Sequence, residues 1–506
     1  LAWHSAAREV SAVTGACLLT RASLYRQLGG FDEQDFGVAY NDVDYCLRVR
    51  AAGHRIIYTP QAKLMHWGSA TRGVTFDEAE HIAFVRRFPA YRDPYFSAHW
   101  RLDDAVVRSR TDGPDRTART GRPRLLLLTH NLNLEGAPLF LLEYAAHLAG
   151  TGSRLEVLAA QDGPLRASFE ALGAHLTVAD PGPLLHAADD DAFSRQLAEL
   201  SGKVDWDQVD LVVCNTLFSF WGVHLARSAD RPSLLYLHES SSVFRAFETR
   251  LALGLHHLVH DALRTATRTL CLCAATRAYY ADDDRGNFRI VPSWIRLADI
   301  DEFRRTHDRA ATRRQLGFRD DEVVIANIGT VCERKGQHIF LRAAALFNRE
   351  HRAGPPVRFV LVGARPGIYL DLIRRDLARL GLANVTLVPE TREVFAHFVA
   401  ADMFVCTSYE ESFPRVVMEA MAFRTPIVST DVHGIADMIG QRQDGYLVKP
   451  GDVAGLARMM GTCLAKERSG KSLAPAAYSK ALRLYDATRV LPWHARLARE
   501  AVLAHE

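Results

Sequence analysis

The sequence predicts an α/β protein whose main part consists of two lobes, each built around a parallel β-sheet. Over residues 123–480, short apolar runs of strand length alternate with amphipathic stretches of helix length, which is typical of a parallel, doubly wound sheet. The alternation is interrupted near residues 292–301, and this break separates two successive series of alternating strands and helices, one for each lobe. The chain of 506 residues is also too long for one hydrophobic core.

The strands and helices follow from the positions of these runs. Ligands of doubly wound sheets bind at the carboxyl ends of the strands, so we expect functional residues directly after the strands. Helices are expected at 139–148 and 337–347. Strands are expected at 125–129, 155–159, 211–214, 234–238, 323–328, 357–363, 385–388, 403–406 and 426–429.

The composition argues against several classes of protein. Lys and Arg number 62 against 59 Asp and Glu, and this balance argues against a partner nucleic acid. The 8 cysteines lack the spacing of zinc ligands, so we expect reduced, buried thiols in a cytosolic protein. Cys271 and Cys273 are expected to share one face of a strand. No apolar run approaches the roughly 18 residues of a membrane span.

A domain boundary is expected early in the chain. Residues 109–122 are polar, rich in turn-forming residues and without apolar periodicity, which predicts a linker. This linker separates a small region, residues 1–108, from the two-lobed region. The chain begins at Leu1 without an initiator methionine, so we interpret it as a fragment of a longer polypeptide.

The most informative segment is 409–422, YEESFPRVVMEAMA, which follows a strand and opens a helix. Ser412 is expected to cap this helix, and Pro414 suits its first position. The helix N-terminus offers unpaired N–H groups and a positive dipole to a diphosphate. Glu411 precedes that end, and Glu419 lies about 7–8 Å along the axis from Pro414. Without the surrounding sequence, Glu411 and Glu419 could equally be two glutamates that are exposed to solvent and have no function.

This segment resembles the Glu-x7-Glu motif of the retaining glycosyltransferases of family 4, which have the GT-B fold of two Rossmann-like lobes with a cleft between them. The resemblance starts at 129–138, continues through 425–434 and 444–452, and covers nearly all of 123–506. It implies an acceptor-side lobe at 123–292 and a nucleotide-sugar lobe at 293–480. A last helix within 481–506 is expected to cross back to the first lobe.

The resemblance also implies roles for individual residues. Glu411 would hold the transferred sugar, and Lys335 would neutralise the departing diphosphate, whose charge grows in the transition state. His238 matches a histidine near the reacting sugar carbon, although a satisfied strand-end histidine is the simpler alternative. No catalytic base, metal or other cofactor is implied for this module. The expected donor-binding residues are Gly136, Arg334, Ser412, Phe413, Arg415 and Glu419, with Gly136 in a glycine loop and Glu419 on the ribose.

Some positions depart from the family pattern. Thr330 stands where the family usually has an arginine, which removes one of two phosphate cations. Arg334 or Arg415 could replace it, because guanidinium groups suit phosphate oxygens, or both could be ordinary solvated side chains. Ser293-Trp294 and Asp437 also differ from the usual residues, and we expect them to tune donor choice.

Residues 1–108 carry a second set of patterns, at 13–19, 28–33, 40–48 and 51–54. These resemble the acceptor-side half of an inverting family 2 glycosyltransferase with the GT-A fold. Asp42 matches the general base before a helix at 43–52, Asp44 completes an Asp-x-Asp, and His66 matches a ligand of the donor's metal, Mg or Mn. The donor half is missing, so this partial module is expected to be inactive unless a longer parent completes it. Acidic residues at a helix start are the alternative for Asp42 alone.

Two weaker signals occupy the region around residue 255. His256, His257 and His260 have helical spacing, but no third-ligand pattern accompanies them, so we expect a partly exposed helix and not a metal site. Residues 243–263 place apolar side chains near helical spacing, with arginines interspersed. They could rest on a membrane surface or, more simply, pack against the lobe.

Together these patterns predict a retaining transferase that moves a hexosyl-type sugar from a UDP- or GDP-linked donor to a growing cell-surface glycan. The acceptor would be a glycan or lipid-linked glycan, used in the cytoplasm at the inner face of the membrane, and the parent chain would be bifunctional. Alternatives are a catalytically silent sugar-nucleotide or glycan-binding protein, and another GT-B enzyme such as a sugar-phosphate-accepting synthase. The geometry expected is a helix N-terminus facing Lys335 across the gap between the lobes, with Glu411 and Glu419 on either side.

Overall fold

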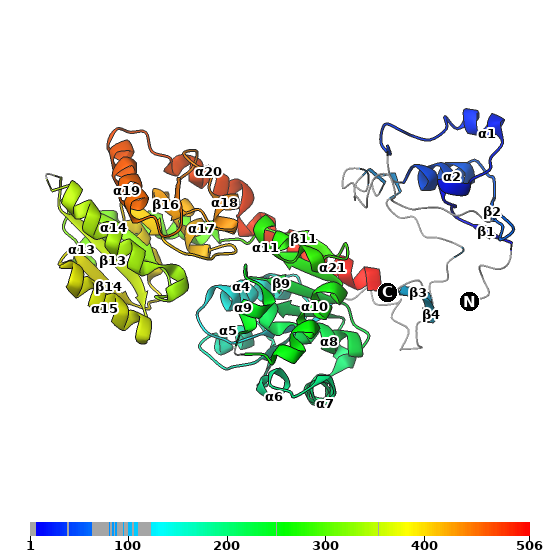
Figure 1. Cartoon of the computed structure of the whole chain (residues 1–506), viewed down its shortest axis with the longest axis horizontal. Helices are drawn as coiled ribbons and strands as arrows, with labels where there is room; N and C mark the ends of the chain where they lie inside the picture. The colour runs from blue at the N-terminus through cyan, green and yellow to red at the C-terminus, as the bar shows by residue number, and fades with distance from the viewer. Residues whose placement is uncertain are drawn as a thin grey trace. The chain divides into compact units, whose positions relative to one another are not determined.

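The computed structural model describes residues 7–37, 40–62, 80, 83–84, 87–88, 95, 100–103, 106–109, 123–248, 250–352 and 354–505. The chain divides into two compact units, residues 1–118 and 119–506 (Figure 1).

The first unit has a small core in its described residues. Strands β1 and β2 pair antiparallel, and α2 packs on them through Tyr45, Cys46 and Val49. Helix α2 begins at Asn41, two residues before the predicted start, so Asp42 lies in its first turn. The elements are β1 (Arg8–Val10), η2 (Gly15–Cys17), α1 (Ala22–Gln27), α2 (Asn41–Ala51), β2 (Ile56–Tyr58), and the antiparallel pair β3 (Trp100–Asp103) and β4 (Val106–Ser109).

The second unit begins with a seven-stranded parallel sheet in the order β11-β10-β9-β8-β5-β6-β7. Its strands are β5 (Arg124–Thr129), β6 (Arg154–Ala159), β7 (His175–Val178), β8 (Leu211–Asn215), β9 (Ser233–Leu237), β10 (Arg268–Cys271) and β11 (Phe288–Ile290). Its helices are α4 (Gly136–Gly150), α5 (Arg166–Ala171), α6 (Gly182–Leu185), α7 (Asp190–Ser201), η3 (Trp206–Gln208), η4 (Leu217–Ser219), α8 (Trp221–Ser228), α9 (Val243–Phe247), η5 (Leu253–Leu255), α10 (His256–Thr265), α11 (Ala274–Tyr279) and η6 (Ala281–Asp283).

A six-stranded parallel sheet follows, in the order β14-β13-β12-β15-β16-β17. Its strands are β12 (Val323–Ile328), β13 (Val357–Ala364), β14 (Val385–Pro389), β15 (Met403–Cys406), β16 (Ile427–Thr430) and β17 (Tyr446–Val448). The helices are α12 (Leu297–Thr306), α13 (Arg309–Gln315), η7 (Glu333–Lys335), α14 (Gln337–Glu350), α15 (Ile368–Leu380), α16 (Val394–Ala400), α17 (Arg415–Ala422), α18 (Gly434–Met438), α19 (Val453–Arg468), α20 (Ala474–Leu484) and α21 (Ala487–His505).

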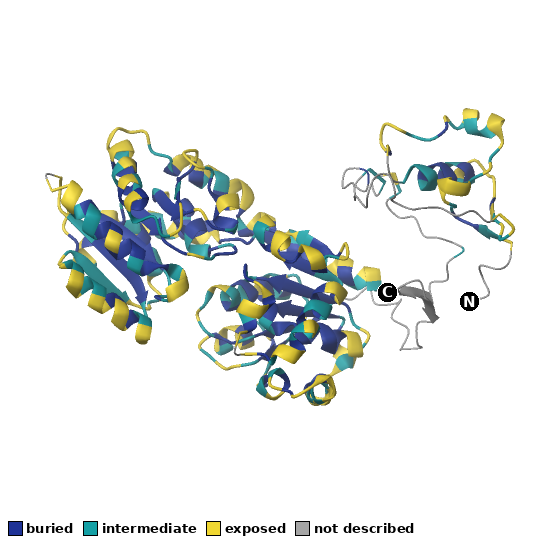
Figure 2. Cartoon of the chain, in the orientation of Figure 1, coloured by how far each residue is buried: buried dark blue, intermediate teal, exposed yellow. Residues whose placement is uncertain are grey.

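The central strands of both sheets are buried on their two faces, as the dark strands in Figure 2 show. In β5, Leu125 and Leu127 belong to one core cluster, whereas Leu126 and Leu128 belong to another. This explains why the sequence shows an unbroken apolar run here, because a strand covered by helices on both faces has no solvent side. The prediction of two α/β lobes is confirmed.

The last helix, α21, packs on the first lobe although it follows the second in sequence. Its Val490, Leu491 and Ala498 belong to the core cluster that contains Leu125 and Leu127 of β5. His494, on the same helix, is fully buried: its Nδ1 lies 2.9 Å from the hydroxyl of Tyr236, and its Nε2 lies 2.9 Å from the carbonyl oxygen of Pro292. The two passages of the chain between the lobes are joined, because Ile295 N donates to Tyr485 O at 2.9 Å and Ala487 N donates to Ile295 O at 2.9 Å.

The prediction for the paired cysteines is wrong in one respect. Cys271 ends β10, but Cys273 lies beyond the strand and accepts a hydrogen bond from Thr276 N at the start of α11. Both thiols are buried and unoxidised. Within the described residues, no helix combines the length and apolarity that crossing a bilayer requires.

Candidate active site

The segment after β15 places the first predicted carboxylate. Residues 407–414 lead from this strand into α17, whose N-cap is Pro414 and whose first residue is Arg415. Pro414 therefore lies one position earlier than predicted. Ser412 does not cap the helix as predicted, because its hydroxyl instead lies 3.1 Å from the hydroxyl of Thr276, at the start of α11 in the first lobe.

Glu411 and Lys335 form a buried ion pair. The ammonium group of Lys335 donates to Glu411 Oε1, and Ser408 donates to the same oxygen at 2.7 Å. The side chain of Glu411 is 7% exposed and that of Lys335 18%. Lys335 ends η7, so it belongs to the same lobe as α17. The expectation that it faces α17 across the gap between the lobes is therefore wrong, since one sheet carries both residues.

Charges hold Glu411 in its ionised form. Burial raises the pKa of this carboxyl, but Lys335 and then Arg334 outweigh that effect and bring the pKa below its ordinary value. Arg334 also donates to the carbonyl oxygen of Glu410 at 2.9 Å. Glu411 is thus a fixed hydrogen-bond acceptor between two cations.

Backbone contacts fix the position of Lys335. The hydroxyl of Thr407 donates to Lys335 O at 2.9 Å, and Tyr409 N donates to Arg334 O at 2.8 Å. Gly336 has a φ of +66°, and a Cβ atom there would lie 2.2 Å from the carbonyl oxygen of Thr407. Glycine is required at this position because only a residue without a side chain allows the two loops to approach.

The second predicted carboxylate, Glu419, belongs to a network that joins the lobes. Arg415 donates through Nε to Glu419 at 2.9 Å and through Nη2 to Glu143, on α4 of the first lobe, at 2.8 Å. The other oxygen of Glu143 accepts from the indole of Trp294 at 2.8 Å. Burial raises the pKa of Glu419, and Arg415 opposes this shift. The sequence did not point to Glu143, although its place on the helix after the glycine loop was a usable signal.

His238 lies at the carboxyl end of β9 in the first lobe. Its Nε2 is 2.9 Å from the side-chain oxygen of Asn215, and the ring of Phe140 packs edge-on against the imidazole. Burial lowers the pKa of His238 to about 3, with help from the charges of His130 and His494. His238 is therefore neutral at physiological pH and can act as a hydrogen-bonding group but not as a cation.

Two further predicted donor residues, Gly136 and Phe413, lie at the start of α4 and just before α17. Gly136 begins α4, and a Cβ atom there would meet no other atom within 4 Å, so the position is open. Phe413 packs against the core clusters of both lobes. The structure thus joins Glu411, Lys335 and Arg334 in one cluster and Glu419 and Arg415 in another, both at α17.

A third cluster was not predicted. Thr330 donates to Glu390 at 3.4 Å, and the guanidinium group of Arg365 binds the same carboxylate at 2.9 Å. Arg365 also reaches Glu135, the N-cap residue of α4, at 3.4 Å. These residues follow the carboxyl ends of β12, β13 and β14 or precede α4, so the rule for ligand positions in such sheets could have found them.

In the first unit, the predicted acidic residues have protein partners. Asp42 accepts from the backbone N–H groups of Gly15 at 2.7 Å and Val43 at 2.8 Å. Asp44 is fully buried and pairs with Arg48 at 2.7 Å and with Arg87 at 2.9 Å. His66 lies outside the described residues. Asp44 is therefore committed to two arginines and is not available to hold a metal ion.

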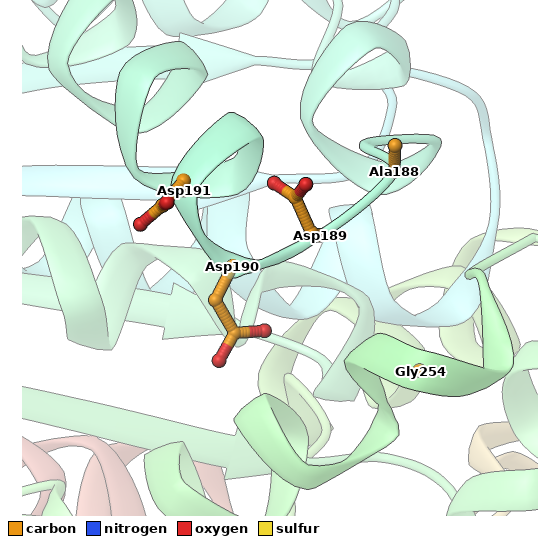
Figure 3. A pocket seen from close by; sticks show the side chains of 5 residues that line it. All are labelled: Ala188, Asp189, Asp190, Asp191 and Gly254. Carbon is orange, nitrogen blue, oxygen red and sulfur yellow. The ribbon is translucent and has the colours of Figure 1, made fainter.

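The histidines near residue 256 also have local partners. His257 lies 3.0 Å from Asp190, and His260 lies 2.7 Å from Asp283. In the part of the chain that the structure describes, no group of three or more His, Cys, Asp or Glu side chains is placed to hold a metal ion. Figure 3 shows a neighbouring surface pocket lined by Ala188, Asp189, Asp190, Asp191 and Gly254. Asp189 caps α7 and Asp190 pairs with His257, and the three carboxylates of this pocket would repel a diphosphate.

Three family models match consecutive parts of the chain. Residues 308–480 match "Glycosyl transferases group 1", and residues 135–294 match "Glycosyl transferase 4-like domain". Residues 1–85 match "Glycosyltransferase like family 2". The first two matches cover the second and first lobe respectively, and the third falls within the first unit.

Curated relatives share part of this length. The D-inositol 3-phosphate glycosyltransferase of Mycobacteroides abscessus is 36% identical over 182 residues, which are 35% of this chain and 39% of the relative. The enzyme of the same name from Geodermatophilus obscurus is 29% identical over 255 residues, 47% of this chain and 56% of the relative. The matched regions thus span about half the length of these relatives or less.

Solved structures share the fold of the second unit. HepE of Anabaena, crystallised with UDP and glucose, has a TM-score of 0.62 at 22% identity and covers 74% of this chain and 99% of its own. Sucrose-phosphate synthase of Thermosynechococcus elongatus has a TM-score of 0.63 at 19% identity, with 75% and 100% covered. The two lobes of the second unit therefore have the GT-B fold, residues 135–294 and 308–480 are each similar to a glycosyltransferase domain, and residues 1–85 are similar to glycosyltransferase family 2.

Proposed function

We propose that residues 123–506 transfer a hexosyl-type sugar from a nucleoside diphosphate sugar to a growing cell-surface glycan, with retention of the anomeric configuration, in a bacterial cell. The observation that carries this proposal is the buried pair of Glu411 and Lys335 beside the N-terminus of α17. An acceptor for sugar hydroxyls and a cation for phosphate oxygens lie side by side there, and a nucleoside diphosphate sugar needs both.

A uridine nucleotide is the first donor to test. HepE, which has the same fold, was crystallised with UDP and with UDP-glucose. We take a hydroxyl group as the acceptor, of the kind that D-inositol 3-phosphate would offer to the relatives named after it. We extend both features to this chain as parts of the proposal, with GDP-linked sugars as the alternative donors.

The proposed reaction needs no catalytic base from the protein. The bond between the anomeric carbon and the leaving phosphate oxygen breaks, and a bond to the acceptor oxygen forms on the same face of the sugar. The proton of the acceptor hydroxyl passes to the leaving phosphate oxygen. Lys335 stabilises the charge that develops on the diphosphate, Glu411 orients the sugar through its hydroxyls, and neutral His238 donates or accepts a hydrogen bond near the reacting carbon.

Donor hydrolysis tests this function directly. Purified full-length protein is incubated with labelled UDP- and GDP-sugars, and the released nucleotide is measured with and without acceptor extracts. We expect slow hydrolysis that Glu411→Ala and Lys335→Ala each reduce by at least about a hundredfold, the usual effect of removing a group that stabilises the transition state. Arg374→Ala is the control, because Arg374 is 61% exposed on α15 and pairs with Asp371 of the same helix.

Other results would select the alternatives. Nucleotide binding without turnover, even with acceptor extracts, would contradict the enzymatic proposal and identify a silent binding protein. Inhibition by simple sugar phosphates would instead indicate a synthase that uses a sugar phosphate as acceptor.

We further propose that the acceptor is lipid-linked and is reached at the cytoplasmic face of a membrane. Phe244 on α9 is 61% exposed and Leu253 on η5 is 66% exposed, although Phe247, Leu251 and Leu255 of the same region pack in the core. Binding to anionic vesicles should fall in Phe244→Ser/Leu253→Ser. It should not fall in Leu503→Ser, which removes a side chain that is 68% exposed on α21 of the same lobe. Equal vesicle binding by all three proteins would rule out this surface.

A further inference from the structure

Position 330 carries no charge although it lies at the carboxyl end of the central strand β12, where ligands of doubly wound sheets bind. Thr330 follows β12, and its hydroxyl donates to Glu390 at 3.4 Å. Its carbonyl oxygen accepts from the amide of Gln337, the first residue of α14, at 3.1 Å. The residue is thus fixed in place at the carboxyl end of a central strand but offers no positive charge.

The two arginines that the sequence suggested as replacements are committed to other carboxylates. Arg334 binds Glu411 and the carbonyl oxygen of Glu410. Arg415 bridges Glu419 and Glu143 across the lobes. Moving Arg415 to a phosphate would leave Glu419 and Glu143 without their shared cation, which is costly. Moving Arg334 would remove one of the two cations that keep Glu411 ionised.

Arg365 lies next to position 330 through the backbone. Gly329 N donates to Val362 O at 3.0 Å, and Val331 N donates to Gly363 O at 2.9 Å. A Cβ atom on Gly363 would lie 2.4 Å from the carbonyl oxygen of Gly329, so the loop that carries Arg365 is in direct contact with the loop that carries Thr330. These backbone contacts therefore fix the start of the Arg365 side chain beside position 330.

The guanidinium group of Arg365 lies between the two loops that the proposed donor would touch. Its Nε donates to both oxygens of Glu390 at 3.1 Å, and its Nη2 reaches Glu135 Oε1 at 3.4 Å. Glu135 immediately precedes Gly136 at the start of α4. The side chains of Arg365, Glu390 and Glu135 are 45%, 44% and 33% exposed. Water can therefore solvate the two carboxylates when the guanidinium group moves away.

We propose that Arg365 binds the diphosphate of the donor in place of the cation absent at position 330. This inference rests on the proposed function and names a binding residue for it. Glu390 holds the guanidinium group near Thr330 in the absence of a donor, and the phosphate oxygens take over its N–H donors when the donor binds. Arginine suits this exchange, because its planar set of donors fits carboxylate and phosphate oxygens equally well.

The proposal predicts opposite signs for the two halves of the ion pair. Arg365→Gln removes the phosphate contact and should weaken binding of UDP or GDP by about tenfold to a hundredfold, as expected for a charge-assisted hydrogen bond. Glu390→Gln removes a competing carboxylate and should leave this binding equal or tighter. A pair with a purely structural role would instead lose binding in both variants.

Binding is measured by calorimetry on the full chain, with uridine and guanosine as ligands that lack phosphate. Their affinity should not change in either variant. Arg374→Gln, on the neighbouring helix α15, is the control for loss of one positive charge from the same lobe. Thr330→Arg in the Arg365→Gln protein should recover most of the lost affinity, since it restores a cation at the adjacent position.

Three outcomes would overturn the inference. The first is unchanged UDP and GDP affinity in Arg365→Gln while Lys335→Ala weakens it, which leaves the proposed function intact. The second is equal loss in Arg365→Gln and Glu390→Gln without rescue by Thr330→Arg. The third is no binding of UDP or GDP by the unaltered protein, which would remove the proposed function together with this inference.

Discussion

At the scale of single residues, Gly336 shows how backbone geometry supports the candidate site. Its φ is +66°, and a Cβ atom at this position would lie only 2.2 Å from Thr407 O, which leaves no room for a side chain. We expect Gly336→Ala to reduce the free energy of unfolding by about 2 kcal/mol or more and to displace Lys335. Urea unfolding gives the first quantity, and donor hydrolysis reports the second.

Gly381 offers a matched control for this substitution. It has a φ of +62°, close to that of Gly336, but a Cβ atom there would meet nothing within 4 Å. Gly381→Ala should therefore cost only the conformational strain, about 1 kcal/mol. Equal losses in the two variants would mean that the contact with Thr407 does not constrain position 336.

The charge of Glu411 predicts a pH dependence of stability. Its pKa is lower in the folded chain than in the unfolded chain, because Lys335 and Arg334 outweigh the opposing effect of burial. A carboxyl with a lowered pKa binds protons more readily when unfolded, so its stabilising contribution is complete above its ordinary pKa of about 4.5. That contribution is lost as the pH falls below this value and through the folded pKa.

Glu411→Gln tests this dependence because it keeps the shape but not the charge. The unaltered protein should be more stable than the variant at pH 7, and the difference should shrink as the pH falls from about 5 to about 3, by urea unfolding at each pH. Asp371→Asn, which affects an exposed pair on α15, should show little such change. A difference that grows on acidification would contradict the assigned direction of the shift.

At the scale of elements, α17 carries groups of the candidate site and also joins the two lobes. Because Arg415 contacts Glu419 on its own helix and Glu143 on α4, the helix is held to the first lobe by a largely buried ion pair. A double-mutant cycle of Glu143→Gln and Arg415→Met should give a coupling free energy of about 1–3 kcal/mol in urea unfolding. Additive effects would show that this contact does not join the lobes energetically.

The elements also show what the sequence could and could not predict. All nine predicted strand runs correspond to strands. Eight of them lie inside a sheet, where strands with two buried faces are continuously apolar, and the ninth, β14, lies at an edge. Four strands of the two parallel sheets lie outside those nine runs. The short strands β7, β11 and β17 are at the edges of their sheets, whereas β10, of which only the run around Cys271 was noted, lies inside its sheet.

Some residues of the candidate site could also be predicted from the sequence, and others could not. Glu411, Lys335 and Glu419 were found from their local motifs. Glu143, Glu390 and Arg365 were missed, because their importance comes from contacts between segments far apart in the chain. Ser412 was assigned the wrong partner for the same reason, since Thr276, whose hydroxyl it contacts, lies in the other lobe.

At the scale of the whole second unit, the first lobe depends on a helix from the end of the chain. Val490, Leu491 and Ala498 of α21 complete the core cluster around β5. A fragment of residues 123–296 should therefore be insoluble or partly unfolded alone. It should gain native-like circular dichroism when a peptide of residues 486–505 is linked to it, because the peptide restores the buried face. A well-folded fragment without that peptide would show that α21 is dispensable.

The joined passages at Ile295 and Asp486 have a consequence for engineering. Everything from α12 to α20 leaves the first lobe and returns to it at neighbouring points, which a parallel bridge holds together. In topological terms, the second lobe is a guest inserted into its host through adjacent entry and exit points. This lobe can be replaced by the corresponding lobe of a relative with only two splice sites. Under the proposed function, such chimaeric proteins would separate the preference for the donor from the preference for the acceptor.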